Sequence, residues 1–166
     1  MRLTSLTDYA LRVLIYAGSN TGRLCTINEI AQAFEISQTH LMKVSQLLAQ
    51  QGLIHTTRGK NGGLCLSHSP DLINLGCVIK AIEPDFALVE CMGKNNACKL
   101  TGKCALTCIL RGARNAFFHH LDCYTLADVI STSNTPNSIG TPASGVLISM
   151  NKEPRPGSNS CPATPK

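Results

Sequence analysis

The sequence is poor in aromatic side chains and has no long apolar run. It contains no Trp, and aromatic residues make up 4% of its 166 positions. Proteins that bind single-stranded nucleic acid by stacking need exposed rings, which argues against that class. No apolar run approaches the ~18–20 residues of a membrane-spanning helix. The first segment carries Asp8 and Arg12 and is not a secretory signal. We therefore expect a cytoplasmic chain in a reducing environment, without a membrane partner.

Acidic residues are missing from one long stretch. Residues 36–70 contain no Asp or Glu, although the chain carries ten acidic and fifteen basic residues and a formal net charge of +5. The missing carboxylates remove repulsion from phosphate, and Lys43, Arg58 and Lys60 would release counterions on binding DNA. This stretch is the first indication of a DNA-binding surface.

The stretch begins inside a pattern of consecutive helices. Apolar residues recur at helical spacing from Leu6 to Ala17, and Ser5 with Asp8 has the spacing of a capping box. Thr26 and Glu29 form a second capping box that opens a second helix. After this second helix we expect a short turn and a third helix. Two short helices joined by a three- or four-residue turn make a helix-turn-helix.

A third helix and a hairpin complete the motif. Ser37 can cap the third helix, and Gly52 stops it. Two β segments, 53–57 and 64–66, then flank a turn at 58–63 that contains Asn-Gly-Gly, a strong hairpin signal. A hairpin directly after a helix-turn-helix is a winged helix.

The second half predicts further helices around a loop. We expect a helix from Asn74 to Glu83, a long helix from Cys104 to His120 and a short one from Thr125 to Ile130. The fold class is therefore mainly α with a small β-hairpin: a winged helix-turn-helix plus a long dimerisation helix. The expected units are a DNA-binding domain (1–84), a cysteine-rich loop (85–103), the dimerisation helix with the short helix (104–130) and a disordered tail (131–166).

The long helix carries a broad apolar stripe that needs a partner. The same helix of a second copy of the chain is one candidate, and packing against its own domain is the alternative. The stripe consists of Leu106, Ile109, Leu110, Ala113, Ala116, Phe117 and Leu121.

Small polar side chains on the third helix can reach base edges in the major groove. We expect its solvent face to carry five residues: Gln38, Thr39, Met42, Ser45 and Gln46. Arg58 at the wing tip is suited to the minor groove, and the wing glycines let the backbone approach phosphate. Winged helices also serve as protein-binding modules, which is the alternative. The predicted DNA contacts are Asn28, Gln38, Thr39, His40, Met42, Lys43, Gln46, Arg58, Lys60, Asn61, Gly62 and Gly63.

Three cysteines share the loop between the helices. Cys91, Cys98 and Cys104 are separated by six and five residues and interleaved with Lys. Thiolates are soft ligands for iron–sulfur clusters or zinc, and nearby Lys compensates their charge. The chain lacks the Cys-x-x-Cys spacing of zinc knuckles, and wide gaps suit a larger object than a single ion. Three alternatives remain. The three cysteines could bind zinc together with Cys108, they could form a metal-free redox switch, or they could be unrelated to one another.

The other cysteines carry no such pattern. We interpret Cys25, Cys65, Cys77 and Cys123 as small core side chains and Cys161 as incidental. No cysteine is paired in the sequence with a His or an acid in the manner of a nucleophile, so we do not expect an enzyme.

These motifs together resemble one family. The opening LTSLTDYALRVLIYAG, the capping-box helix, the wing RGKNGG and the three-cysteine loop are similar to the iron–sulfur winged-helix transcriptional repressors, over residues 1 to about 130. Within them, RGKNGG, AIEPDFALVEC and DCYTLADVI most resemble the nitric-oxide-sensitive branch. The cluster-biogenesis branch has a His ligand where this chain has Thr107, so that ligation is absent here.

The resemblance implies a mechanism. Cys91, Cys98 and Cys104 would hold a 4Fe-4S or 2Fe-2S cluster, with Asp8 of the other subunit as fourth ligand and Cys108 as a possible competitor. A homodimer would then bind promoter DNA as a repressor. Nitrosylation of the cluster would release the DNA of genes for nitric-oxide detoxification. A winged-helix regulator that uses a cluster, zinc or thiols to respond to iron or redox state is the alternative.

Overall fold

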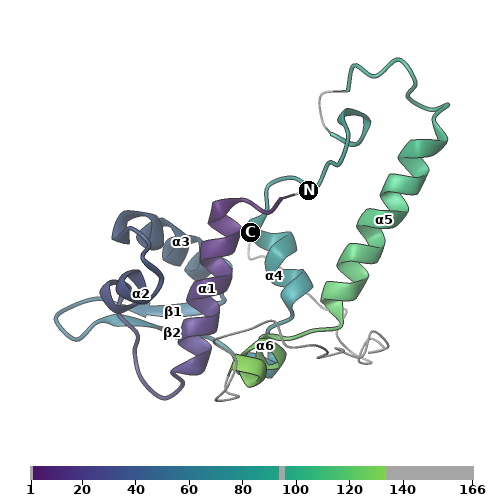
Figure 1. The fold of residues 1–166 in the computed structure, drawn as a ribbon. Helices are drawn as coiled ribbons and strands as arrows, with labels where there is room; N and C mark the ends of the chain where they lie inside the picture. Colours follow the sequence, from purple (N-terminus) through teal and green to yellow (C-terminus); the bar gives the residue numbers. More distant parts are fainter. Residues whose placement is uncertain (1, 94–95, 134–166) are drawn as a thin grey trace.

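The computed structural model describes residues 2–93 and 96–133 (Figure 1). It confirms a mainly helical chain with one two-stranded antiparallel hairpin. From residue 134 onward the predicted disordered tail, including Cys161, lies outside the described residues. Lys94 of the cysteine loop also lies outside them.

Helix α1 (Ser5–Ser19) is the centre of the core. It packs against α3, α6 and β2, and Val13 and Leu14 are fully buried. Helix α6 (Leu126–Ser133) crosses it so closely that a Cβ on Gly18 would overlap Ile130. The predicted Ser5–Asp8 capping box is wrong, because Thr4 is the N-cap and accepts from the Thr7 N–H at 3.4 Å.

The helix-turn-helix forms as predicted. It consists of α2 (Ile27–Phe34) and α3 (Gln38–Gln50). Thr26 caps α2 by accepting from the Glu29 N–H at 3.2 Å, and Ser37 caps α3 by accepting from the His40 N–H at 3.3 Å. The turn between them passes through Glu35, whose φ of 54° and ψ of 39° are left-handed.

The wing consists of β1 (Ile54–Thr57) and β2 (Gly63–Leu66), paired with Ile54 opposite Leu66. Cys25 pairs with the other edge of β2 as an isolated bridge, which sequence reasoning missed: its N–H donates to the Leu64 C=O and its C=O accepts from the Leu64 N–H, both at 2.8 Å. This bridge joins the wing to the segment before α2.

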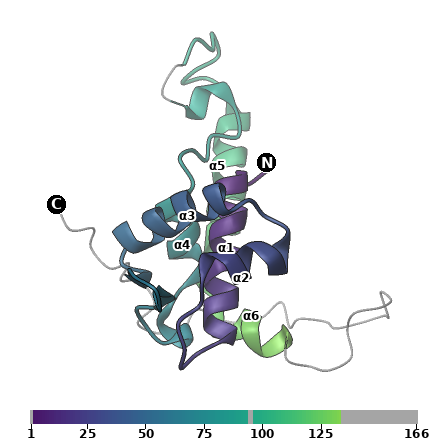
Figure 2. The same cartoon turned by 90° about the vertical axis from the view of Figure 1, so that its left-hand side faces the viewer.

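Helix α4 (Leu75–Ile82) lies between α1 and the long helix α5 (Ala105–Asp122) (Figure 1). The short 3₁₀ turns Pro70–Leu72 and Glu90–Met92 lie before and after α4. In Figures 1 and 2, α5 and the cysteine loop extend away from the winged helix, and the loop lies at the end of α5 farthest from α6.

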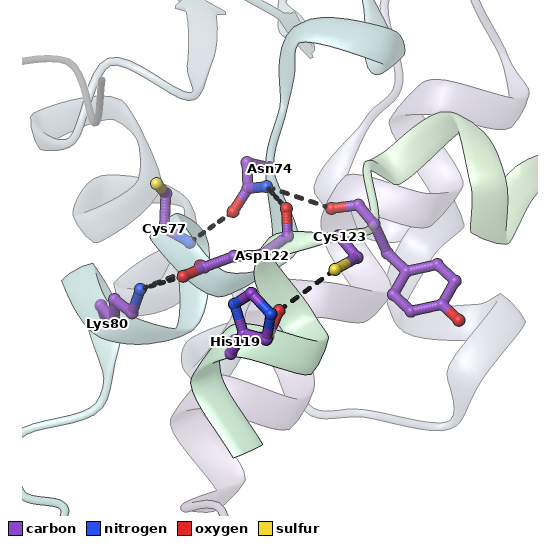
Figure 3. A network of polar contacts seen from close by, with 7 residues as sticks. Asn74, Cys77, Lys80, His119, Asp122 and Cys123 are labelled. Carbon is purple, nitrogen blue, oxygen red and sulfur yellow. Dashed lines mark hydrogen bonds and ion pairs between the residues drawn. The ribbon is translucent and has the colours of Figure 1, made fainter. Parts of the chain in front are cut away.

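A polar network clamps the base of α5 onto α4 (Figure 3). The Asn74 amide donates to the Asp122 carbonyl at 2.7 Å, and the Lys80 ammonium bonds both oxygens of the Asp122 carboxylate at 2.8 Å. A Cβ on Gly76 would overlap that carboxylate. The clamp therefore depends on glycine at this one position of α4.

Only the lower part of the predicted apolar stripe is covered by the chain itself. Phe117 and Leu121 are half-buried, and Phe118, which is not part of the stripe, packs edge-to-face with Phe86 at 4.6 Å between ring centroids. Toward the cysteine loop, Leu106 is 55% exposed and Ile109 is 67% exposed. The upper stripe therefore presents an uncovered apolar face.

Replacing Glu35 with Gly is expected to stabilise the fold. A left-handed conformation costs a side chain ~1–2 kcal/mol, and Gly brings an entropic cost of ~0.5–1 kcal/mol. We expect the free energy of unfolding to rise by about 0.5–1 kcal/mol, measured as a higher urea midpoint at constant m-value. Glu35→Ala removes the same charge but keeps Cβ. An equal gain in that variant would show that charge, not backbone conformation, is responsible.

Candidate functional site

A groove separates the exposed face of α3 from the wing. Its volume is about 880 Å³, and the acid-free stretch contributes most of its lining. The groove brings together part of the predicted DNA-contact set: Met42, Gln46, Arg58, Gly62 and Gly63. Its lining also includes Thr26, Ile27, Thr56 and Thr57, which sequence reasoning missed because nothing in their spacing linked them to the third helix.

The remaining predicted contacts lie around this groove. Gln38 donates from Nε2 to Asn28 Oδ1 at 2.9 Å, which fixes both side chains at the exposed start of α3. The His40 ring lies 6.2 Å from that of Tyr9, measured between centroids. Thr39, Lys43, Lys60 and Asn61 are exposed.

Ser45 lines this groove but is buried, contrary to its expected place on the solvent face. It is 5% exposed, and its hydroxyl has no hydrogen-bond partner among the described residues. The helix turns it toward Leu41 and Leu48, which are fully buried on the same side of α3. The sequence could not separate Ser45 from Gln46 because both are polar neighbours at the boundary between the two faces.

The wing glycines are required by the chain itself. A Cβ on Gly63 would lie 2.7 Å from the Cys25 carbonyl oxygen, and one on Gly62 would overlap the Thr57 carbonyl. Gly59 has a φ of +114°, which favours glycine for conformational reasons. Close packing of the wing thus explains two of these glycines without a ligand.

Two of the three predicted cysteine ligands meet at Thr107 in the first turn of α5. Cys91 Sγ lies 3.1 Å from Thr107 Oγ1, and Cys104 is the N-cap of the helix. Cys91, Cys98 and Cys104 are half-buried free thiols, whereas Cys108 is exposed one turn further along. Cys98 belongs to a separate turn, in which its C=O accepts from Thr101 Oγ1 at 2.7 Å.

The start of α5 favours a thiolate at Cys104. Its sulfur makes no regular cap hydrogen bond, but the N–H groups of Thr107 and then Leu106 face it and lower the pKa of the Cys104 thiol. Partial positive charge at a helix N-terminus has this effect on thiols. A lowered thiol pKa is the condition under which a cysteine binds a soft cation or reacts with an electrophile.

Asp8 lies apart from these thiols in the single chain. Its carboxylate accepts from Arg12 Nε at 3.1 Å, one turn along α1, and the two side chains are about half exposed. No group of three or more His, Cys, Asp or Glu residues is gathered for a metal within residues 2–93 and 96–133. The donor chemistry of the three thiols fits an iron–sulfur group, while one chain does not present a closed ligand set.

A buried carboxylate connects the cysteine loop to α1. Glu83, at the end of α4, is 9% exposed and accepts from the hydroxyls of Thr4 and Thr7 and from the Thr4 N–H. Sequence reasoning assigned Glu83 only to a helix end. Its position before Pro84, where the loop starts, was the one signal available. The root of the loop is thus fixed to the turn that carries Asp8.

The remaining cysteines follow the predicted pattern in part. Cys25 and Cys123 are buried, and burial raises the pKa of the Cys25 thiol. Cys65 and Cys77 are only half-buried.

Within the described residues, no helix is both long and apolar enough to span a membrane.

Comparison with known proteins identifies the family. The model of the Rrf2 protein family, described as an iron-dependent transcriptional regulator, matches residues 3–132. The chain belongs to the Rrf2 family. This Rrf2 chain is therefore a transcriptional regulator and not an enzyme, as the sequence predicted.

Similar proteins support this assignment over most of the chain. The HTH-type transcriptional regulator NsrR of Bacillus licheniformis is 48% identical over 132 residues, which cover 78% of this Rrf2 chain and 92% of the relative. NsrR of Bacillus subtilis is 44% identical over 132 residues, with 78% and 90% covered. The structure of CymR, the global cysteine regulator of B. subtilis, has a TM-score of 0.64 at 26% identity and covers 80% of this chain and 98% of its own.

The lowered pKa of Cys104 predicts selective alkylation. In the reduced, cluster-free chain at pH 7, Cys104 should react with iodoacetamide faster than Cys108, because more of it is thiolate. The difference should shrink as the pH passes the ordinary thiol pKa of ~8.5. Mass spectrometry of the two labelled positions over time measures both rates. Cys108 is the more exposed thiol, so faster labelling of Cys108 at pH 7 would contradict the prediction.

Proposed function

We propose that the chain is a dimeric transcriptional repressor whose iron–sulfur cluster senses nitric oxide. The observation that carries the proposal is the meeting of Cys91 and Cys104 at Thr107, at the start of a helix whose apolar face is uncovered. The similarity to regulators named NsrR supports the same function. The protein would act in the cytoplasm, where thiols stay reduced.

Residues 1–84 would bind promoter DNA. The proposed contacts are those predicted from the sequence, with α3 in the major groove and the wing against the adjacent backbone. The groove between α3 and the wing supports this arrangement, because its lining within residues 2–93 and 96–133 contains no carboxylate. Among the described residues that line it, Arg58 is the one with a charge, which makes that side chain the clearest candidate for a phosphate or minor-groove contact.

Residues 104–130 would form the dimer. Leu106 and Ile109 stay largely exposed in the single chain, and covering them with the same face of a second copy would remove this apolar area from water. Two winged helices would then face half-sites about one DNA turn apart, ~34–36 Å.

The loop at 85–103, together with Cys104, would hold the cluster. Cys91, Cys98 and Cys104 would be three ligands, and Asp8 of the second copy would be the fourth. A bound cluster would supply iron that nitric oxide can attack. To serve as a ligand, Asp8 has to leave its ion pair with Arg12, which is exposed and therefore inexpensive to break.

The contacts of α1 support a route from the cluster to the DNA. Glu83 joins the root of the cysteine loop to the α1 turn that carries Asp8. Tyr9 lies beside His40 in the first turn of α3, and Arg12 lies 5.8 Å from the Phe34 ring centroid in α2. Loss of the cluster would free Asp8 and alter the position of α1 beneath the helix-turn-helix. About 1–3 kcal/mol of coupling is enough to change operator affinity substantially.

A second candidate function is a regulator of the same fold that responds to iron or thiol redox state. Two observations favour it. The family is described as iron-dependent, and the Cys104 thiol has a lowered pKa. Such a regulator would bind and release DNA with iron supply or oxidant, and nitric oxide would have no effect.

Arg58 is expected to contribute an electrostatic contact to DNA. Arg58→Ala should weaken operator binding and reduce the slope of log K against log salt by about one, the value for one lost phosphate contact. Arg58→Lys keeps the charge and should keep the slope. Fluorescence anisotropy across a salt series measures both. A normal slope in Arg58→Ala would exclude Arg58 from the phosphate contacts.

The cluster proposal is tested by a pair of cysteine variants. Anaerobically reconstituted wild type should contain iron and sulfide, lose its visible absorbance as nitric oxide is added, and release operator DNA in parallel. Cys98→Ala should lose cluster and tight DNA binding together, and Cys108→Ala should keep both. Unchanged operator affinity in Cys98→Ala would refute the switch. Loss of cluster in Cys108→Ala would identify that thiol, in place of Asp8, as the fourth ligand.

A further inference from the structure

Thr107 touches two thiols that come from different segments. Its hydroxyl lies 3.1 Å from Cys91 Sγ, sixteen positions away along the chain. Three positions earlier, at the start of the same helix, the N–H groups of Thr107 and Leu106 lower the pKa of the Cys104 thiol. Cys91 belongs to the 3₁₀ turn Glu90–Met92, and Cys104 is the N-cap of α5. Thr107 thus touches the loop through Cys91 and belongs to the first turn of the helix that Cys104 caps.

We propose that Thr107 is a positioning residue that holds Cys91 and Cys104 together as a ready pair of ligands. The proposal rests on the proposed cluster function. The Thr107 hydroxyl has a proton to donate to one thiolate, and its N–H supplies a second donor to the other. A thiolate pair is otherwise repelled by its like charges, and two donors on one residue offset that repulsion.

Local helix formation does not account for a threonine here. Thr is a weaker helix former than Ala or Leu, which occupy the two positions before it. Its hydroxyl is engaged by a sulfur from the loop. The half-buried position also excludes part of the water that would compete for the thiols. Hydrogen bonding to ligand sulfur is one of the ways a protein tunes an iron–sulfur group.

The matched variants are Thr107→Val, which replaces the hydroxyl with a methyl group of similar size, and Thr107→Ser, which keeps the hydroxyl. Equal thermal unfolding midpoints of both variants and the wild type establish that any difference is local. The first measurement uses the reduced, cluster-free full chain in a Cys108→Ser background. Phenylarsine oxide, which bridges two neighbouring thiols, is titrated into each protein, and peptide mapping identifies the bridged pair.

We expect the arsenical to bridge Cys91 and Cys104 in the wild type and in Thr107→Ser. Thr107→Val should bind it about fivefold more weakly, the factor for one lost hydrogen bond. The second measurement uses anaerobically reconstituted protein with a chelator added. The visible absorbance of Thr107→Val should decay about fivefold faster than that of Thr107→Ser.

Arsenical affinity and decay rates in Thr107→Val equal to those of the wild type would overturn the proposal. Bridging of Cys98 in place of Cys91 in the wild type would also overturn it. The two levels of inference fail separately. A wild type that takes up neither iron nor sulfide, yet shows the arsenical contrast, refutes the cluster function and leaves the positioning role of Thr107 in force.

Discussion

The clamp between α4 and α5 is the constraint on which the arrangement of the molecule depends. Asp122 is bonded to Lys80, its carbonyl is bonded to Asn74, and Gly76 leaves space for its carboxylate. Lys80 also lies 5.1 Å from the Phe118 ring centroid. These contacts secure one end of α5, while its other end carries exposed Leu106 and Ile109 beside the thiols. The clamp thus sets how α5 projects from the winged helix and carries the thiols at its far end (Figure 1).

Much of the fold could be predicted because its signals are local. Thr26 and Ser37 start their helices as capping chemistry requires, and the Asn-Gly-Gly turn forms the wing. The errors arise where a choice depends on tertiary contacts. Thr4, and not Ser5, caps α1, where the Glu83 carboxylate also accepts from Thr4. Helix α6 continues to Ser133, past the predicted end at Ile130, and Ile130 itself packs over Gly18.

The candidate site was predictable in composition but not in contacts. The acid-free stretch and the three cysteines are visible in the sequence, and the structure places Cys91 against Thr107, in the first turn of the helix that Cys104 caps. The sequence could not reveal that Thr107 makes this connection, since a threonine in a helix has no distinctive pattern. It also could not reveal that Glu83 is buried against Thr4 and Thr7, because the pairing spans most of the DNA-binding domain. Polar contacts between residues this far apart in the chain depend on the fold and leave no local sequence motif.

The length of α5 has a mechanical consequence. The helix has 18 residues, so at 1.5 Å per residue its tip lies roughly 27 Å from the clamped base. A lever of that length converts a tilt of about 10° at the base into a displacement of roughly 5 Å at the tip, by the same helix dimensions. Conversely, a displacement of the thiols by less than a bond length corresponds to a rotation of only about one or two degrees at the α4 end of the helix. Along α5, a displacement at the thiols therefore corresponds to only a small rotation at the base, whereas Glu83 contacts α1 directly through Thr7.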